Sequence, residues 1–387
     1  MRILFKHLLR LQLILMPLLL VSGCWDYKEL QKMNYITTLA IDYKDNQYTL
    51  YLQSLDFSSI AKQESGKSQS NPKNSFVKAT GSSISEAFFK IFKAEQLRIF
   101  LGHVISIVLT KEALLQIGPI DLTDLIDRYR EVRYNVWLFG SEEKIEDILN
   151  INLPYGYPLN DSVLLNPMTT YRQDSYIKPI YMFRFITEFN EAGKTVAMPI
   201  LSLDKNQWTE SGKPLTLLKM TGDYYFHSKK FVGQLTDEQL MGKRFLSHNV
   251  YRFLLKINGS TGEKPILFLI TEPKFKIDYT VESNTVLYNL KIVVKAHLEE
   301  MLENLDDEMM IRKIKDEVEK EILTTFQNGK AIGADVLSLN DHLYRYHHQD
   351  WTKYLKDKEG QDATQIRDIN VKVIIVDSGK YKARTAD

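Results

Sequence analysis

The stretch "SISEAFFKIFKAE", residues Ser83 to Glu95, decides the fold of the first half of the chain. Ser83 and Glu86 have the spacing of a capping box, in which the two side chains satisfy backbone N–H groups at the start of a helix. Apolar residues follow at helical spacing, namely Ile84, Ala87, Phe88, Ile91 and Phe92. The stretch therefore predicts an amphipathic helix with one buried face.

Strand patterns lie on both sides of this helix. The segment "HVISIVLT" (residues 103–110) follows it and has apolar residues on both faces, as expected for a covered central strand. The predicted strands are residues 35–41, 48–52, 103–110 and 132–139, of which the first two form a hairpin. The further predicted helices are residues 122–130 and 142–149. Helices that alternate with strands in this order predict a mixed sheet with packed helices.

The middle of the chain has a different composition. Residues 153–199 contain five prolines, so we expect a long irregular segment with one helix near residues 181–189. Within it, "PYGYPLNDSVLLNPMTTYRQDSY" (residues 154–176) is rich in tyrosine and proline. This stretch is either a binding surface or a coil packed on its own domain. The polar stretch of residues 58–75 is predicted to be an exposed loop, and residues 203–214, "LDKNQWTESGKP", a linker.

The second half predicts a sheet with long helices. Thr236 and Gln239 form a second capping box, and a long helix is expected to end at Asn328 and Gly329. Strands are predicted at residues 215–226, 230–232, 265–271, 274–281, 286–297 and 369–377, and a last helical stretch at residues 333–357. The predicted class is α+β, with a mixed-sheet N-terminal domain (residues 24–205) and an antiparallel-meander C-terminal domain (residues 214–387). A division of the latter into two subdomains stays open.

The N-terminus has the layout of an export signal. Basic residues Arg2, Lys6 and Arg10 precede an apolar run at residues 11–21, and small residues follow. The apolar run covers roughly 15 Å as a helix, about half of a membrane's hydrocarbon core. Residues 21–24, "VSGC", resemble a bacterial lipobox, and Cys24 is the single cysteine of the 387-residue chain. We therefore predict a lipoprotein signal at residues 1–23, a lipid on Cys24, and no disulfide.

Charge argues against nucleic acid as a partner. Three of the 50 basic residues lie in the signal, which leaves 47 basic against 49 acidic residues in the mature chain, a net charge of about −2. A nucleic-acid-binding domain is ordinarily basic. The 44 % hydrophobic content is that of a folded protein.

No catalytic constellation is found in the sequence. His342, His347 and His348, with Asp341 and Asp350, form the densest group of potential metal ligands, but five- and six-residue spacings do not share one face of a helix. We interpret them as a helix surface, and His103 and His297 as packing or capping residues. Signatures for a serine nucleophile, a zinc protease helix or a phosphate-binding loop are absent. The sequence therefore predicts no catalytic, metal or cofactor site, and no enzyme.

Several motifs together resemble a known family. They are "GCWDYKEL" (23–30), "LAID" (39–42), "ATGSSISEAFFKI" (79–91), "LGHVISIVLTKEAL" (101–114), "GQLTDEQ" (233–239), "GADVLSLNDHLYRYHHQDW" (333–351) and "INVKVIIVDSGK" (369–380). In this order they are similar to the Ger(x)C spore germination proteins, the C subunits of nutrient germinant receptors.

The resemblance implies a lipoprotein on the outer face of the spore inner membrane, anchored through Cys24. It implies integral-membrane A and B subunits as partners, and no catalytic residues. The alternative is an unrelated exported lipoprotein, either a solute-binding protein or a surface hydrolase.

Overall fold

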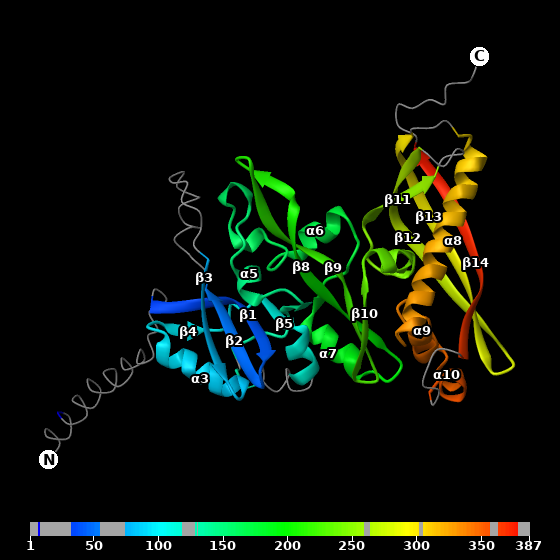
Figure 1. Ribbon diagram of the computed structural model, residues 1–387. Helices are drawn as coiled ribbons and strands as arrows, with labels where there is room; N and C mark the ends of the chain where they lie inside the picture. The colour runs from blue at the N-terminus through cyan, green and yellow to red at the C-terminus, as the bar shows by residue number, and fades with distance from the viewer. Residues whose placement is uncertain are drawn as a thin grey trace.

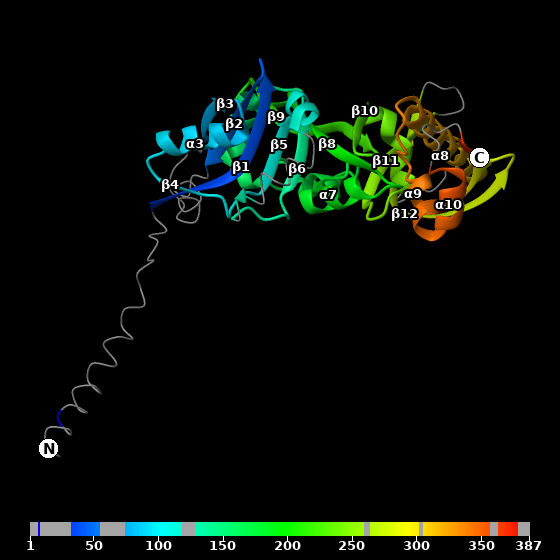
Figure 2. The same ribbon diagram turned by 90° about the horizontal axis from the view of Figure 1, so that it is seen from below.

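The computed structural model describes residues 7, 32–54, 74–117, 128–129, 131–258, 264–301, 305–356 and 363–377. The described part forms two units, each with its own sheet, that lie end to end (Figures 1 and 2). The prediction of an α+β protein is confirmed. Three predicted segments fall outside the described residues: the signal apart from residue 7, the helix at 122–130 apart from residues 128 and 129, and residues 58–73 of the loop.

The first unit is built on a mixed sheet of ten strands in the order β10-β9-β8-β6-β5-β1-β2-β3, with β4 beside β1 and β7 beside β6. Strands β1, β5, β6 and β8 run parallel, whereas the hairpins β1–β2 and β8–β9 are antiparallel. The strands are β1 Met33–Lys44, β2 Gln47–Ser54, β3 Ser75–Gly81, β4 Arg98–Phe100, β5 Ser106–Thr110, β6 Trp137–Ser141, β7 Ile180–Tyr181, β8 Thr195–Glu210, β9 Lys213–His227 and β10 Lys230–Thr236.

Successive side chains of β1 point to opposite faces of this sheet, and both faces are covered. Leu39 and Ile41 point to one core, and Ala40 points to a second core on the opposite face. Helices α3 and α7 contribute to the first core, and α5 contributes to the second. The helices of this unit are α3 Ile84–Ala94, α5 Ile145–Leu149, α6 Pro167–Gln173 and α7 Met182–Asn190, with 3-10 turns at Pro154–Gly156 and Leu159–Asp161.

Helix α3 begins where the sequence predicts it. The Ser83 hydroxyl accepts a hydrogen bond from the Glu86 N–H, as expected of an N-cap. The Glu86 carboxylate, however, accepts from the Ser82 N–H and hydroxyl at 2.7 Å, one residue earlier than a standard capping box. The Lys90 ammonium, together with these two hydrogen bonds from Ser82, lowers the pKa of Glu86 to about 2.

The second unit has a four-stranded sheet in the order β11-β12-β13-β14. Strands β11, β12 and β13 are antiparallel neighbours, whereas β14 lies parallel to β13. The core of this unit lies between one face of the sheet and the long helix α8. Its elements are η4 Glu238–Leu246, β11 Arg252–Asn258, β12 Pro265–Glu282, β13 Thr285–Met301, α8 Asp307–Ala331, α9 Leu339–Tyr346, α10 His348–Tyr354 and β14 Thr364–Asp377.

Helix α8 ends at Ala331, two residues beyond the predicted stop at Asn328 and Gly329. Gly333, with φ +72°, adopts the left-handed conformation that ends many helices. The Gly333 N–H donates to Lys330, and the Ala334 N–H to Gly329. This is a Schellman motif, so the stop signal is Gly333 and Gly329 lies within the helix.

Three predictions need correction. Residues 203–214 are not a linker, because β8 and β9 continue through them as one antiparallel hairpin, with Glu210 opposite Lys213. The predicted strands 265–271 and 274–281 are the single strand β12, interrupted by a bulge. The prediction of an antiparallel second sheet is wrong for β14, because β14 pairs in parallel with β13. A local sequence pattern contains no information on which strands become neighbours.

The two units are joined by an apolar cluster. It contains Tyr225 of β9 and Leu235 of β10, packed with Leu240 of η4 and with Val336, which follows α8. The predicted capping box of Thr236 and Gln239 is present in the structure. Leu235 and Leu240 lie on either side of it as a hydrophobic staple. No helix in the described ranges has the length and apolar character that crossing a membrane requires.

Candidate functional site

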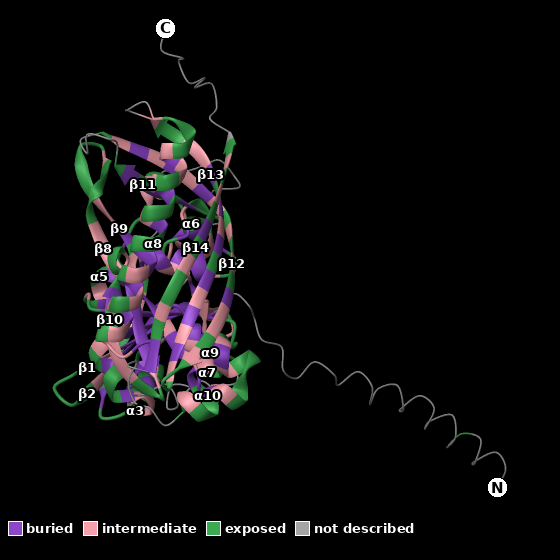
Figure 3. Cartoon of the chain, turned by 90° about the vertical axis from the view of Figure 1, so that its right-hand side faces the viewer, coloured by how far each residue is buried: buried purple, intermediate pink, exposed green. Residues whose placement is uncertain are grey.

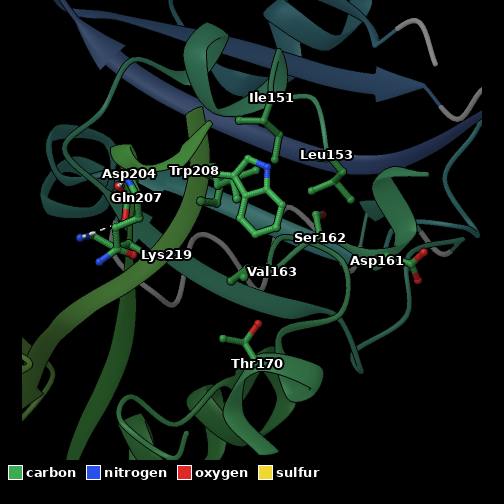
Figure 4. A pocket seen from close by; sticks show the side chains of 12 residues that line it. Ile151, Leu153, Asp161, Ser162, Val163, Thr170, Asp204, Gln207, Trp208 and Lys219 are labelled. Carbon is green, nitrogen blue, oxygen red and sulfur yellow. Dashed lines mark hydrogen bonds and ion pairs between the residues drawn. The ribbon is translucent and has the colours of Figure 1, made fainter. Parts of the chain in front are cut away.

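A pocket of about 320 Å³ lies between the irregular segment and the β8–β9 hairpin (Figure 4). One wall comes from the segment that we considered as a binding surface, and the other from the residues mistaken for a linker. The lining residues are Ile151, Leu153, Asp161, Ser162, Val163, Thr170, Asp204, Gln207, Trp208, Leu217, Leu218 and Lys219. Half of these side chains are apolar and half are polar or charged. Sites that bind a partner or a small molecule combine apolar walls with a few polar groups.

Exposed aromatic side chains stand near the pocket. Tyr155 is 80 % exposed, and its ring lies 6.5 Å from the Trp208 ring and 6.3 Å from the Tyr157 ring, edge to face in both cases. Tyr155 has φ +59°, a conformation that is strained for a large side chain. Its N–H donates to the Glu210 carboxylate at 2.9 Å, which holds it against the hairpin tip. We call Tyr155, Tyr157 and Trp208 the aromatic rim.

Two polar atoms next to this pocket lack hydrogen-bond partners. Ser162 is 2 % exposed and its Oγ is unpaired, as is the Oδ1 of Asn160. A buried unpaired polar group costs about 1–3 kcal/mol, so such groups call for a reason. Asp204 and Lys219 lie 3.6 Å apart in the same lining. The backbone N–H groups of Asn206 and Gln207 lower the pKa of Asp204, so it carries a negative charge at neutral pH.

This arrangement suits binding better than chemistry. A serine nucleophile needs a base within hydrogen-bond reach, and Ser162 Oγ has none. No histidine or cysteine lines the pocket. Within the described ranges, no three His, Cys, Asp or Glu side chains are arranged to hold a metal ion.

The structure places the sequence-predicted residues as follows. Cys24 lies outside the described residues, so the lipid site stays a prediction. His342 and His347 have ring centroids 6.3 Å apart, while His348 stacks on Trp351 and His347 meets the edge of Tyr279. Burial lowers the pKa of His342. The three rings thus lie on or between α9 and α10, where His347 packs against Tyr279 of β12 and His348 against Trp351 of α10.

The two isolated histidines also make packing contacts. His103 packs edge to face on Tyr35 at 5.0 Å, and His297 lies 3.3 Å from the Thr271 hydroxyl across β12 and β13. Both positions agree with a packing or capping role.

Sequence reasoning missed the polar contact between the two units. Lys194 Nζ lies 2.8 Å from the Asp341 carboxylate, and Arg345 donates to Asp341 at 3.0 Å and also pairs with Glu191. The partners are 147 and 154 residues apart, so no local pattern connects them. Within α9 the sequence offers only Asp341 in the first turn and Arg345 in the last turn, four residues apart.

Comparisons with known proteins point to one family. Residues 26–203 match the family described as "Spore germination protein N-terminal domain", and residues 221–379 match "Spore germination B3/ GerAC like, C-terminal". The chain is 22 % identical to Spore germination protein KC of Bacillus subtilis (strain 168) over 367 residues, 89 % of each chain. It is also 22 % identical to Spore germination protein B3 of the same organism, over 87 % of this chain and 88 % of that protein.

The fold agrees with this assignment. A crystal structure of the GerBC protein superposes with a TM-score of 0.53 and 16 % identity, covering 87 % of this chain and 96 % of the other. Two successive family domains thus account for nearly all of the described residues in the expected order. The chain belongs to the Ger(x)C family of spore germination proteins.

Proposed function

We propose that this protein is the lipid-anchored C subunit of a spore nutrient germinant receptor. In this role it docks with the integral-membrane A and B subunits on the outer face of the spore inner membrane, and it performs no catalysis. The observation that carries the proposal is the match of two consecutive germination-protein domains along residues 26–379. Cys24, two residues before the first domain, supplies the attachment point.

Lipid anchoring follows from the order of the N-terminal elements. The apolar run at residues 11–21 is about half as long as a spanning helix, so it is better suited to a cleaved signal than to an anchor. Two acyl chains on Cys24 would bind a membrane far more firmly than one chain. A tethered subunit also has a raised local concentration near its membrane partners, so modest direct affinity is enough for assembly.

The aromatic rim is the surface that we assign to docking. Tyr and Trp are enriched at protein interfaces, because they bury a large apolar area while the polar end keeps a hydrogen bond. Tyr155 is 80 % and Tyr157 55 % exposed, and Trp208, which lines the pocket, is 38 % exposed. The strained backbone of Tyr155 presents its ring outward, which a packed coil would not need.

The alternative of an unrelated exported lipoprotein has less support. A two-lobed solute-binding protein needs two similar lobes around a cleft, whereas the two sheets here have ten and four strands in different orders. A hydrolase needs a nucleophile with its base, which the pocket lining does not contain. Family membership also counts against both.

Spores that lack the protein test the proposal. They should lose the germination response to one class of nutrient, while agents that bypass nutrient receptors should still trigger germination. Related receptors should be deleted in the same strain, so that redundancy does not hide the effect. Normal responses to every nutrient in that background would contradict the proposal.

Substitutions in the aromatic rim test docking separately. Spores with Tyr155→Ala and Trp208→Ala should respond more slowly to the nutrient at an unchanged level of the protein. Phe89→Ala with Tyr346→Ala is the matched control, because these rings are 65 % and 70 % exposed on α3 and α9, away from the pocket. If the two double variants slowed germination equally, the aromatic rim would not be part of the docking surface.

A further inference from the structure

The four-stranded sheet of the second unit has one covered and one open face. Val294 and Ile292 of β13 point to the core with Ile314 and Val318 of α8, and all four are at most 1 % exposed. The intervening residues of β13 point the other way. Along β14, exposed residues alternate with intermediate or buried ones from residue 369 to residue 376 (Figure 3).

The open face carries a block of lysines. Three consecutive cross-strand rows of β12, β13 and β14 contain Thr271–Lys295–Ile374, Lys274–Val293–Lys372 and Lys276–Lys291–Asn370. These nine positions include five lysines and no carboxylate. We call the five lysines (Lys274, Lys276, Lys291, Lys295 and Lys372) the basic face. All five are exposed.

Only part of this charge is neutralised within the chain, although the next row, Asp278–Asn289–Asp368, contains two carboxylates. Asp278, in the next row, lies 2.8 Å from Lys276 and 3.1 Å from Lys291, so two lysines share one carboxylate. Within the described part of the chain, no carboxylate forms an ion pair with Lys274, Lys295 or Lys372. Sheet geometry places the five charges within about 10 Å by about 13 Å. That is close to the screening length of about 8 Å at physiological salt, so they act together on a partner.

We propose that the basic face binds a membrane surface that contains anionic lipids. Protein interfaces are depleted in lysine and enriched in Tyr, Trp and Arg, and the nine positions hold five lysines and no aromatic residue. Lysine is a compact charge on a flexible stem, which suits phosphate groups that move within a bilayer. Val293 and the 39 % exposed Ile374 add apolar surface between the lysines.

The inference deepens the proposed function and rests on it only for the location of the protein. A basic patch combined with a lipid is a common two-part membrane anchor. Contact through the basic face would limit how the body of a tethered protein turns on the membrane. The orientation of the aromatic rim toward partners would then be limited as well.

Vesicle binding of the chain from Trp25 to Asp387 tests this inference. This chain keeps both sheets and every residue of the four apolar clusters, the first of which is Ile36. It should sediment with vesicles of equal parts phosphatidylcholine and phosphatidylglycerol, but not with phosphatidylcholine alone, and added salt should weaken binding. Equal binding to both kinds of vesicle, or to neither, would overturn the proposal; binding to an acidic protein would not rescue it.

Charge-matched variants locate the contact. Each lysine near an anionic surface strengthens binding about 5-fold, so Lys274→Gln with Lys295→Gln and Lys372→Gln should weaken it about 100-fold. Lys44→Gln with Lys93→Gln and Lys213→Gln removes the same charge from exposed sites elsewhere and should leave binding unchanged. Equal losses in the two triple variants would contradict the assignment to the basic face. Because this chain lacks Cys24, an absence of vesicle binding would contradict the basic face alone. Lipid attachment and the receptor role are tested by separate experiments.

Discussion

Lys194 donates to the Asp341 carboxylate over 2.8 Å and so joins the segment before β8 to helix α9 of the other unit. The two side chains are 13 % and 10 % exposed. Beside them, the Asp335 N–H donates to the Thr195 hydroxyl at 3.1 Å. A fixed contact of this kind would couple a movement of one unit to the other unit.

Removal of Lys194 should destabilise the protein. Lys194→Met leaves Asp341 with Arg345 alone in a mostly buried site, and we expect the free energy of unfolding to fall by about 2–3 kcal/mol in chemical denaturation. Lys78→Met is the control, because the Lys78–Glu146 pair is 52 % and 34 % exposed and should cost less than about 1 kcal/mol. Equal losses would show that the contact between the units adds nothing.

Asp335 should make stability depend on pH. Burial raises the pKa of Asp335 to about 6, although three backbone N–H groups of α9 donate to its carboxylate. The folded state then holds this proton more tightly than the unfolded state, whose pKa is about 3.9. The resulting stabilisation is present below about pH 4 and is lost as the pH rises through about 6, a change of roughly 3 kcal/mol.

Asp335→Asn removes this titration. The free energy of unfolding of the wild type should therefore fall relative to the variant between about pH 4 and pH 6. Burial also raises the pKa of Asp174 to about 6, but Asp174 is present in both proteins and cancels in the difference. Parallel curves over this range would refute the prediction.

Gly242 should not tolerate a side chain. A Cβ there would lie 2.3 Å from the Glu321 carbonyl oxygen and 2.5 Å from the Ile322 Cα, both backbone atoms of α8. We expect Gly242→Ala to lower the free energy of unfolding by about 3 kcal/mol. Gly212→Ala, at the hairpin tip with φ +78° and open space around it, should cost about 1 kcal/mol from backbone strain alone. A smaller loss at Gly242 than at Gly212 would be inconsistent with close packing of η4 on α8.

Ser162 should be replaceable without loss of stability. Its buried Oγ has no partner, so Ser162→Ala removes an unpaired group and should raise the free energy of unfolding by about 1 kcal/mol. Ser106 is also buried, but its hydroxyl donates a hydrogen bond to Thr38 at 3.2 Å. Ser106→Ala should therefore lower the free energy of unfolding by about 1 kcal/mol. If both variants lost the same free energy of unfolding, the Ser162 hydroxyl would have a hydrogen-bond partner in solution.

The sequence predicts those elements whose causes are local. The cap at Ser83, the strand at residues 35–41 and the long helix before Gly329 need only near neighbours, and each appears in the structure. The β8–β9 hairpin was missed because Lys205, Asn206 and Gln207 are exposed, and polar residues near a Ser-Gly turn resemble a linker. The parallel pairing of β14 and the contact of Tyr155 with Trp208 depend on distant partners, which no single stretch encodes.

Lipid modification of Cys24 is the central claim, and the intact mass of the protein extracted from spores measures it directly. We predict a chain that begins at residue 24 and carries a diacylglyceryl group on the sulfur, recovered with the membrane fraction. Cys24→Ala should leave the protein in the soluble fraction. A membrane-bound protein with an unmodified thiol at residue 24, or a Cys24→Ala variant that stays on the membrane, would contradict the lipid-anchored subunit that we propose.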